Sequence, residues 1–203
     1  MYGVGSRIKL TQTTVKYFIV TAVADTVLTV YGGTDYTLAN AAISSIYVSN
    51  MKSPLGFPVD PAKWTVESTT STELSQATPS SGTWYNLGSM NIVVPIGAWR
   101  LYYSCNAGMA DNTATSWMYT TLSTGNNTES DTEMTALVYA YFNGTNALVV
   151  QTHFKEQLVT LAAKATYYLN GMVNIAGTDN IRHGVIISGR NSLTIIRAVC
   201  VYL

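Results

Sequence analysis

Short segments rich in Val, Ile, Thr and Tyr recur along the whole chain, with turn residues between them at intervals of roughly 8–12 residues. β-Branched and aromatic side chains favour extended strands. Asn-Gly and Gly-Thr-Asp groups favour the turns between strands. This succession is typical of β-sandwiches and β-barrels. The spacing therefore predicts an all-β protein.

Residues 1–62 predict a small β-barrel-like module. Its strand-like segments are 7–10, 15–23, 26–31 and 46–48, and residues 38–43 favour one short helical turn. Pro54, Pro58 and Pro61 follow, and proline is excluded from central strands. Of the nineteen residues from 65 to 83, eleven are Ser or Thr. Such a composition is typical of linkers, so we expect a rigid exit followed by a linker over residues 63–82.

Residues 83–203 predict a jelly-roll β-sandwich. The expected strands are 84–94, 98–105, 115–122, 134–142, 147–154, 158–161, 166–175, 183–188 and 193–202. Leu158, Leu161, Ala162 and Ala165 have helical spacing, but Thr166-Tyr167-Tyr168 follows directly and favours strands. The apolar segment 195–203 predicts a last strand in the middle of a sheet, because unpaired termini are usually polar and frayed.

The charge balance argues against several classes of partner. Eleven basic residues balance eleven acidic ones, and neither sign clusters. A nucleic-acid binder would show a basic face, so we exclude DNA and RNA as partners. No apolar stretch reaches the ~18 residues that span a bilayer. The start has no signal-peptide pattern, so we expect synthesis in the cytoplasm without membrane insertion.

The residues that usually carry catalysis are few. His153 and His183 are the only histidines, and Asp179 near His183 is the candidate acid for a catalytic pair. The sequence holds no GxSxG nucleophile elbow, no P-loop and no GxGxxG motif. Cys105 and Cys200 lie in apolar segments, so we expect buried reduced thiols, with a disulfide left open. The chain is expected to be no enzyme and to need no cofactor.

Three carboxylates alternate after the turn Gly125-Asn126-Asn127. Glu129, Asp131 and Glu133 would point the same way if this segment were extended, and calcium prefers several oxygen ligands from one loop. They are therefore weak metal candidates. A solvated acidic loop is the preferred interpretation, and a glycosidase pair is less favoured.

The chain holds fourteen Tyr and four Trp. Within the strands we assign Trp99, Tyr102, Tyr103, Tyr167 and Tyr168 to the core or to an oligomer interface. Loops on rigid sandwiches usually carry recognition, so receptor contacts are expected at the predicted loops 106–114, 123–131, 143–146 and 177–182. The candidate contact residues are Asn106, Asp111, Asn112, Asn126, Asn127, Asn143, Asn146, Asp179 and Arg182.

Several segments resemble known phage proteins. Segments 16–23, 26–30, 32–43 and 50–58 resemble minor structural and tail-fibre proteins of tailed bacteriophages. Segments 166–170 and 194–200 resemble the C-terminal modules of similar phage proteins. The order of the strands and the run Trp99-Arg100-Leu101-Tyr102 are similar to trimeric heads of the tumour-necrosis-factor and complement type.

The resemblance implies a virion protein without catalytic residues. The N-terminal module would attach to other virion proteins, and a homotrimeric jelly-roll head would face outward and bind a host-surface glycan or protein. A long repetitive shaft, usual in fibres, is absent from the sequence. A short spike or tail-tip component and a capsid decoration or head-fibre protein therefore both stay open. A free carbohydrate-binding, lectin-like module is the alternative outside the virion.

Overall fold

A computed structural model describes residues 2–33, 37–111, 115–141, 147–174, 178–186, 189 and 192–203. The fold is all-β, as the sequence predicts. The helical elements of the described residues are two single 3-10 turns, η1 (Pro61–Trp64) and η2 (Thr132–Met134). No helix in this part of the chain is long and apolar enough to cross a membrane.

The N-terminal part is one antiparallel sheet of four strands in the order β3-β2-β1-β4. The strands are β1 (Arg7–Gln12), β2 (Thr14–Val23), β3 (Leu28–Tyr31) and β4 (Ser44–Ser49). One face of the sheet buries Ile8, Leu10, Phe18 and Val20 against one another. β3 and β4 lie at the two edges of this sheet.

Residues 38–43 do not form the predicted helical turn. The buried Gln12 side chain holds them in an irregular conformation: Nε2 donates to the carbonyls of Ala39 and Ala41 at 3.0 and 3.1 Å, and Oε1 accepts from Ala39 N at 3.0 Å. These bonds satisfy backbone groups that a helical turn would have paired within itself. The helical prediction for this segment is therefore wrong.

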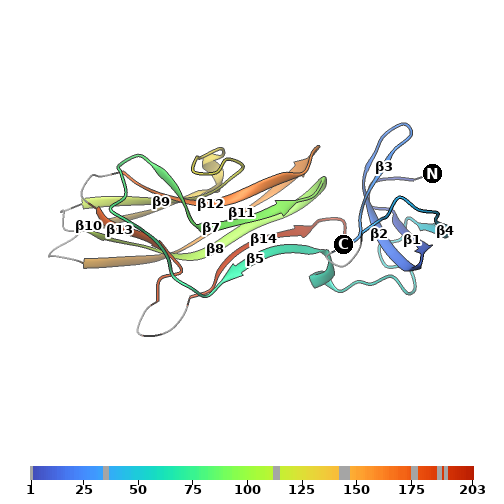
Figure 1. Cartoon of the computed structure of the whole chain (residues 1–203), viewed down its shortest axis with the longest axis horizontal. Coiled ribbons are helices and arrows are strands. Elements are labelled where there is room, and N and C mark those ends of the chain that lie inside the picture. The colour runs from blue at the N-terminus through green and yellow to red at the C-terminus, as the bar shows by residue number, and fades with distance from the viewer. Residues whose placement is uncertain are drawn as a thin grey trace.

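A jelly-roll sandwich forms the rest of the molecule. Its first sheet has the order β10-β9-β12-β7, made of β7 (Trp84–Val94), β9 (Thr115–Ser123), β10 (Thr135–Tyr141) and β12 (Ala165–Val173). The second sheet contains β5 (Thr65–Thr70), β6 (Leu74–Ala77), β8 (Gly97–Asp111), β11 (Ala147–Leu161), β13 (Thr178–His183) and β14 (Thr194–Cys200). Figure 1 shows the two sheets running along the long axis, with the N-terminal sheet at one end.

β8 organises the second sheet. Along one edge, all fifteen of its residues pair with β11. Along the other edge, residues 99–104 pair with β14 and residues 107–111 pair with β13. β14 also pairs with β5, so the C-terminal strand lies inside the sheet and confirms that prediction.

Three predictions about strand boundaries are wrong. The Ser/Thr-rich segment predicted as a linker forms β5 and β6, which pair with β14 and β13. Residues 147–161 are one strand rather than two, because Lys155, Glu156 and Gln157 continue the pairing with β8. The strand expected at 183–188 lies instead at Thr178–His183.

Twenty-four buried side chains form the core between the two sheets and at the end next to the N-terminal sheet. Trp99, Tyr103 and Tyr167 belong to it, as expected, whereas Tyr102 and Tyr168 are only half-buried. Cys105 and Cys200 are free, buried thiols, which confirms the expected reduced state. Burial raises the pKa of both thiols above the ordinary value.

Candidate functional site

The outer face of the sheet β7-β12-β9-β10 carries one large side chain from each strand in a single row. Met172 in β12 lies directly opposite Trp84 in β7 and Tyr119 in β9, and Tyr119 lies opposite Leu137 in β10. Successive residues of a strand point to opposite faces of a sheet. Met118, next to Tyr119, is fully buried in the core, so the row points outward.

The loop between β9 and β10 forms a wall beside this row. Glu129 and Thr132 from the loop, with Thr135 from the start of β10, line a hollow of about 470 Å³ together with the four side chains of the row. We call this site the aromatic hollow. The Thr135 hydroxyl donates to Glu129 Oε1, which places the carboxylate at the wall of the hollow.

Hydrogen bonds fix the loop over the sheet. The buried Asn170 side chain in β12 donates from Nδ2 to the carbonyls of Gly125 and Thr128 at 3.0 and 2.8 Å. Asn127 Oδ1 accepts from the backbone N–H of Asn86 in β7 at 2.6 Å. These three bonds tie the loop to β12 and β7, two of the strands that form the hollow. The wall of the hollow is therefore held in place rather than left as a free loop.

Further aromatic side chains extend this face beyond the hollow. Trp117 lies opposite Tyr139, and their ring centroids are 5.3 Å apart. Tyr139 is 57% exposed. Trp84 and Tyr119 within the hollow have centroids 6.4 Å apart and planes inclined by 62°. The four rings come from one face of one sheet, and the planes of Trp117 and Tyr139 are inclined by 57°.

Sequence reasoning missed this site because it assigned the aromatics within strands to the core or to an oligomer interface. The signal is present as alternation. Trp117 and Tyr119 flank the buried Met118, and Leu137 and Tyr139 flank the buried Val138. Large apolar side chains at i and i+2, with another apolar residue between them, indicate a strand that has apolar groups on both faces.

The three carboxylates predicted as weak metal ligands have three different partners. Glu129 accepts from Thr135, Asp131 Oδ1 accepts from Glu133 N at 2.8 Å as the cap of η2, and Glu133 Oε2 accepts from Gln157 Nε2 at 3.4 Å. The 3-10 turn breaks the extended alternation on which the prediction depended. Among the residues described, no group of three or more His, Cys, Asp or Glu side chains could hold a metal ion.

The residues predicted as receptor-contact loops fall into three groups. Asn126 and Asn127 lie in the β9–β10 loop, as expected. Asn106 and Asp111 lie in β8 rather than in a loop, and Asp179 and Arg182 lie in β13, so these four placements are wrong. Asn112, Asn143 and Asn146 lie outside the described residues.

Two of these four residues form side-chain contacts within the chain. Asn106 Oδ1 accepts from the Thr152 hydroxyl of β11 at 2.8 Å. The Arg182 guanidinium forms an ion pair with Glu73 at 2.8 Å and donates to Asn180 Oδ1 at 2.6 Å. These side chains serve contacts between neighbouring strands or segments of the chain.

Both histidines lie inside the sandwich. His153 in β11 lies opposite Cys105 of β8, and His183 in β13 lies opposite Ala107 of the same strand. Burial lowers the pKa of His153 to about 4 and that of His183 to about 3. Both imidazoles are therefore neutral at pH 7. His183 Nε2 lies 3.2 Å from the Thr120 hydroxyl.

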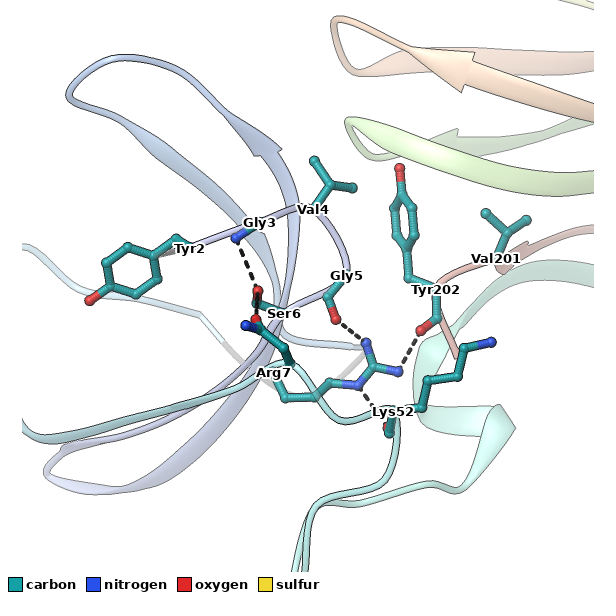
Figure 2. Close-up of a pocket in the computed structure, with 10 residues that line it drawn as sticks. Tyr2, Gly3, Val4, Gly5, Ser6, Arg7, Lys52, Val201 and Tyr202 are labelled. Atoms are coloured by element: carbon teal, nitrogen blue, oxygen red, sulfur yellow. Dashed lines mark hydrogen bonds between the residues drawn. The ribbon is translucent and has the colours of Figure 1, made fainter.

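A buried arginine joins the N-terminal sheet to the C-terminal end of the chain (Figure 2). Arg7 is 2% exposed, and its guanidinium donates to the backbone carbonyls of Gly5, Lys52 and Tyr202. The hollow around it has a volume of about 610 Å³. Burial lowers the pKa of Arg7 from its ordinary value. Because its polar contacts are to carbonyls of the same chain, the guanidinium acts as a structural link.

Aromatic packing completes the junction between the N-terminal sheet and the sandwich. The Tyr31 ring contacts Trp99 and Trp64 at centroid distances of 5.0 and 5.9 Å, and Phe57 stacks on Trp64 at 5.4 Å. Gly97 has φ of 127°, and a Cβ there would lie 2.8 Å from Thr21 Cβ. The close approach of β2 to the start of β8 therefore requires glycine at this position.

Comparisons with known proteins add little to this geometry. No family model matches the chain, and no curated protein matches it. A chain in the structure of infectious bursal disease virus, Gx strain, is similar to 99% of this chain, with a TM-score of 0.33 and 10% sequence identity. The present chain covers 57% of that viral chain. These values are too low to assign a shared fold or activity.

Proposed function

We propose that the chain is a non-catalytic structural component of a tailed-bacteriophage particle. In this proposal the N-terminal sheet binds neighbouring virion proteins, and the sandwich forms an exposed head that self-associates as a homotrimer. The resemblance of segments 16–23, 26–30, 32–43 and 50–58 to phage structural proteins supports the assignment to a particle. The jelly-roll topology fits the expected head.

The observation that carries the proposal is the apolar surface of the N-terminal part. Of the 22 exposed large hydrophobic side chains among the described residues, thirteen lie within residues 1–62. Monomeric soluble proteins rarely expose contiguous apolar patches larger than a few hundred Å². We therefore infer that a partner covers this part of the molecule.

The edge strand β4 contributes three consecutive residues to that surface. It reads Ser-Ser-Ile-Tyr-Val-Ser and carries no charged residue or proline, the usual protections of an exposed edge. Ile46, Tyr47 and Val48 are exposed. The strand pairs with β1 along one edge, and no strand of the described residues pairs with its other edge. An unprotected apolar edge suits pairing with another chain.

The outer face of β11 supports self-association of the sandwich. Phe154 and Leu158 are 54% and 69% exposed, and Phe154 lies 5.9 Å from Tyr102 of β8 by ring centroids. The ion pair between Arg100 and Glu156, with Nε and Oε1 3.4 Å apart, lies beside them. Glu156 lies between Phe154 and Leu158 along β11, so this face mixes apolar groups with a paired charge, as protein interfaces commonly do.

Imaging of intact particles tests the assignment. With the chain labelled by a specific antibody fragment, cryo-electron microscopy should show density at a tail or at a capsid, which separates a tail component from a decoration protein. A chain that is absent from every particle of its phage overturns the proposal and favours the free lectin-like alternative.

Light scattering tests the homotrimer separately. The purified protein should have about three times the monomer mass, and Leu158→Lys should reduce it to a monomer. Val93→Lys places the same charge at an exposed position of the other sheet and is the matched control. A parent protein that is monomeric at micromolar concentration contradicts the homotrimer.

A further inference from the structure

We propose that the aromatic hollow on the outer face of β7-β12-β9-β10 binds an uncharged oligosaccharide. This inference does not depend on whether the chain belongs to a virion. It concerns a surface of the purified protein, and the side chains that form it come from one sheet and one adjoining loop.

The floor of the hollow suits the apolar face of a sugar ring. Trp84 and Tyr119 present aromatic surface beside Met172 and Leu137, and all four point outward from the sheet. An aromatic ring has a negative face, and the axial C–H groups of a pyranose have a slight positive polarisation. Stacking of a sugar on such a ring therefore combines apolar contact with a favourable electrostatic interaction.

The wall of the hollow supplies the hydrogen-bonding groups that a sugar needs. Glu129 provides a carboxylate that accepts from hydroxyl donors, and Thr132 provides a hydroxyl, whereas the Thr135 hydroxyl already donates to Glu129. Hydrogen bonds to an ionised acceptor are about twice as strong as neutral ones. Ligand sites commonly combine a mainly apolar lining with a few fixed polar groups in volumes of about 300–1,000 Å³, and the hollow of about 470 Å³ matches this pattern.

Charge decides against an anionic ligand. Of the described residues that line the hollow, Glu129 is the single charged one. A phosphate, a sulfate or an acidic sugar would place like charge beside this carboxylate, which costs binding energy. The site is therefore selective for an uncharged ligand over an acidic one.

The shape of the floor decides against a small cationic ligand. A quaternary ammonium group is recognised by aromatic rings that surround it as a cage. Here the rings come from one face of one sheet, so they lie beside one another and do not surround a ligand from opposite sides. The row crosses four strands spaced about 4.8 Å apart, so it is about 14 Å long. A floor of this length accommodates more than one sugar ring in line.

The test uses the purified full-length protein and a glycan array. The array carries neutral oligosaccharides of glucose, galactose, mannose and N-acetylglucosamine. Sialylated and phosphorylated glycans are the acidic comparison, and choline is tested in solution. Hits are measured by isothermal titration and by quenching of tryptophan fluorescence. We expect saturable binding of at least one neutral oligosaccharide and no binding of the acidic glycans or of choline.

Two variants assign the binding to the hollow. Trp84→Ala removes part of the floor and should weaken affinity about tenfold or more, equivalent to ~1.4 kcal/mol. Glu129→Gln keeps the size of the side chain and removes its charge, and it should also weaken affinity. Because Glu129 is an exposed loop residue, this second variant tests the site even if Trp84→Ala is unstable.

Tyr168→Ala is the matched control. Tyr168 lies on the same outer face of β12, four residues before Met172, and does not line the hollow. Its affinity should equal that of the parent. The proposal is overturned by the absence of any neutral ligand, by preferred binding of choline or of acidic glycans, or by a Glu129→Gln variant that binds as the parent does. None of these outcomes bears on whether the chain occurs in phage particles.

Discussion

The N-terminal sheet and the sandwich are both antiparallel, yet they obtain their stability in different ways. The sandwich encloses most of a core of 24 buried side chains between two sheets. The N-terminal sheet has its own cluster of only four buried side chains on one face. Ile19 on its other face belongs to the larger core. The N-terminal sheet thus depends on the sandwich for one face and leaves much apolar surface uncovered.

This difference teaches which part of the molecule is complete on its own. A sheet with a small cluster and an apolar edge gains stability when a neighbour covers it. The sandwich has paired strands on both sides of β8 and a closed core. We therefore expect substitutions in the sandwich core to affect the whole chain, and substitutions in the N-terminal sheet to act locally.

The largest effect is expected from Leu101→Ala in β8. Leu101 is fully buried, and a Leu-to-Ala truncation in a core costs about 2–5 kcal/mol. Denaturant unfolding should show this loss as a lower midpoint for the whole molecule. Phe18→Ala in β2 is the comparison: hydrogen exchange should show lost protection in β1 and β2 and unchanged protection in β8. Equal loss in both regions would show that the two parts unfold as one unit.

The next largest effect is a loss of stability at low pH, caused by the buried His153. The unfolded chain protonates histidine near pH 6.5, whereas folded His153 does so near pH 4. Between these values the unfolded state binds the extra proton, so the free energy of unfolding falls as pH decreases. One histidine shifted by this amount contributes about 3 kcal/mol across the window. His153→Leu should remove its share of the pH dependence between pH 6.5 and 4.

The pH experiment also compares the two regions, because both histidines lie in the sandwich. Acid should therefore weaken the sandwich directly, and the cluster of β1 and β2 only through its dependence on the sandwich. Urea unfolding at a series of pH values measures the effect. A pH profile identical in the parent and in His153→Leu would contradict the assignment of a neutral buried imidazole.

Arg7→Met tests the link between the two regions. The substitution removes hydrogen bonds from a charged donor to three carbonyls, and bonds of this kind contribute about 1.5–3 kcal/mol each when buried. Water can reach part of the surrounding hollow, so we expect a net loss of about 2 kcal/mol. Hydrogen exchange should report faster exchange in β1 and in residues 201–203, with β12 unchanged as the internal control. Unaltered exchange at both ends would mean that aromatic packing alone holds the junction.

The smallest effect on stability is expected from Ile46→Lys at the exposed edge strand. Exposed substitutions usually change the free energy of unfolding by less than about 0.5 kcal/mol. Binding to a partner should nevertheless be lost, because a lysine on an edge strand prevents pairing with another strand. Incorporation into particles measures this effect. Thr26→Lys, at the exposed turn between β2 and β3, adds the same single charge and is the control.

Much of the fold follows from the sequence because alternation and turn residues act locally. The limits of β7, β9 and β12 were predicted to within two residues. Residues 65–77 were misassigned because their Ser and Thr side chains are typical of linkers. They form strands because they pair with distant parts of the chain. β14 and β13 present edges with which they pair. Pairing partners more than 100 residues away leave no local signal.

The candidate site was less predictable than the fold. The acidic loop was identified, but its partners were not. Glu129 forms part of the hollow because Thr135 holds it beside Trp84 and Tyr119. These two residues come from strands separated by more than 30 residues. The aromatics of β9 and β10 looked like core residues because burial depends on which sheet face meets a second layer. That choice is made by the tertiary structure.

The position of β14 also determines when the sandwich can be completed during synthesis. β8 leaves the ribosome early, but the strand that pairs with residues 99–104 is made some 90 residues later. Sheets built from such distant strands fold slowly. The N-terminal sheet contains no strand beyond Ser49. Its four strands can therefore pair long before β14 is synthesised. In the sandwich, by contrast, the edge of β8 that pairs with β14 stays unpaired until β14 has been synthesised. A requirement for chaperones during production of this protein would originate there.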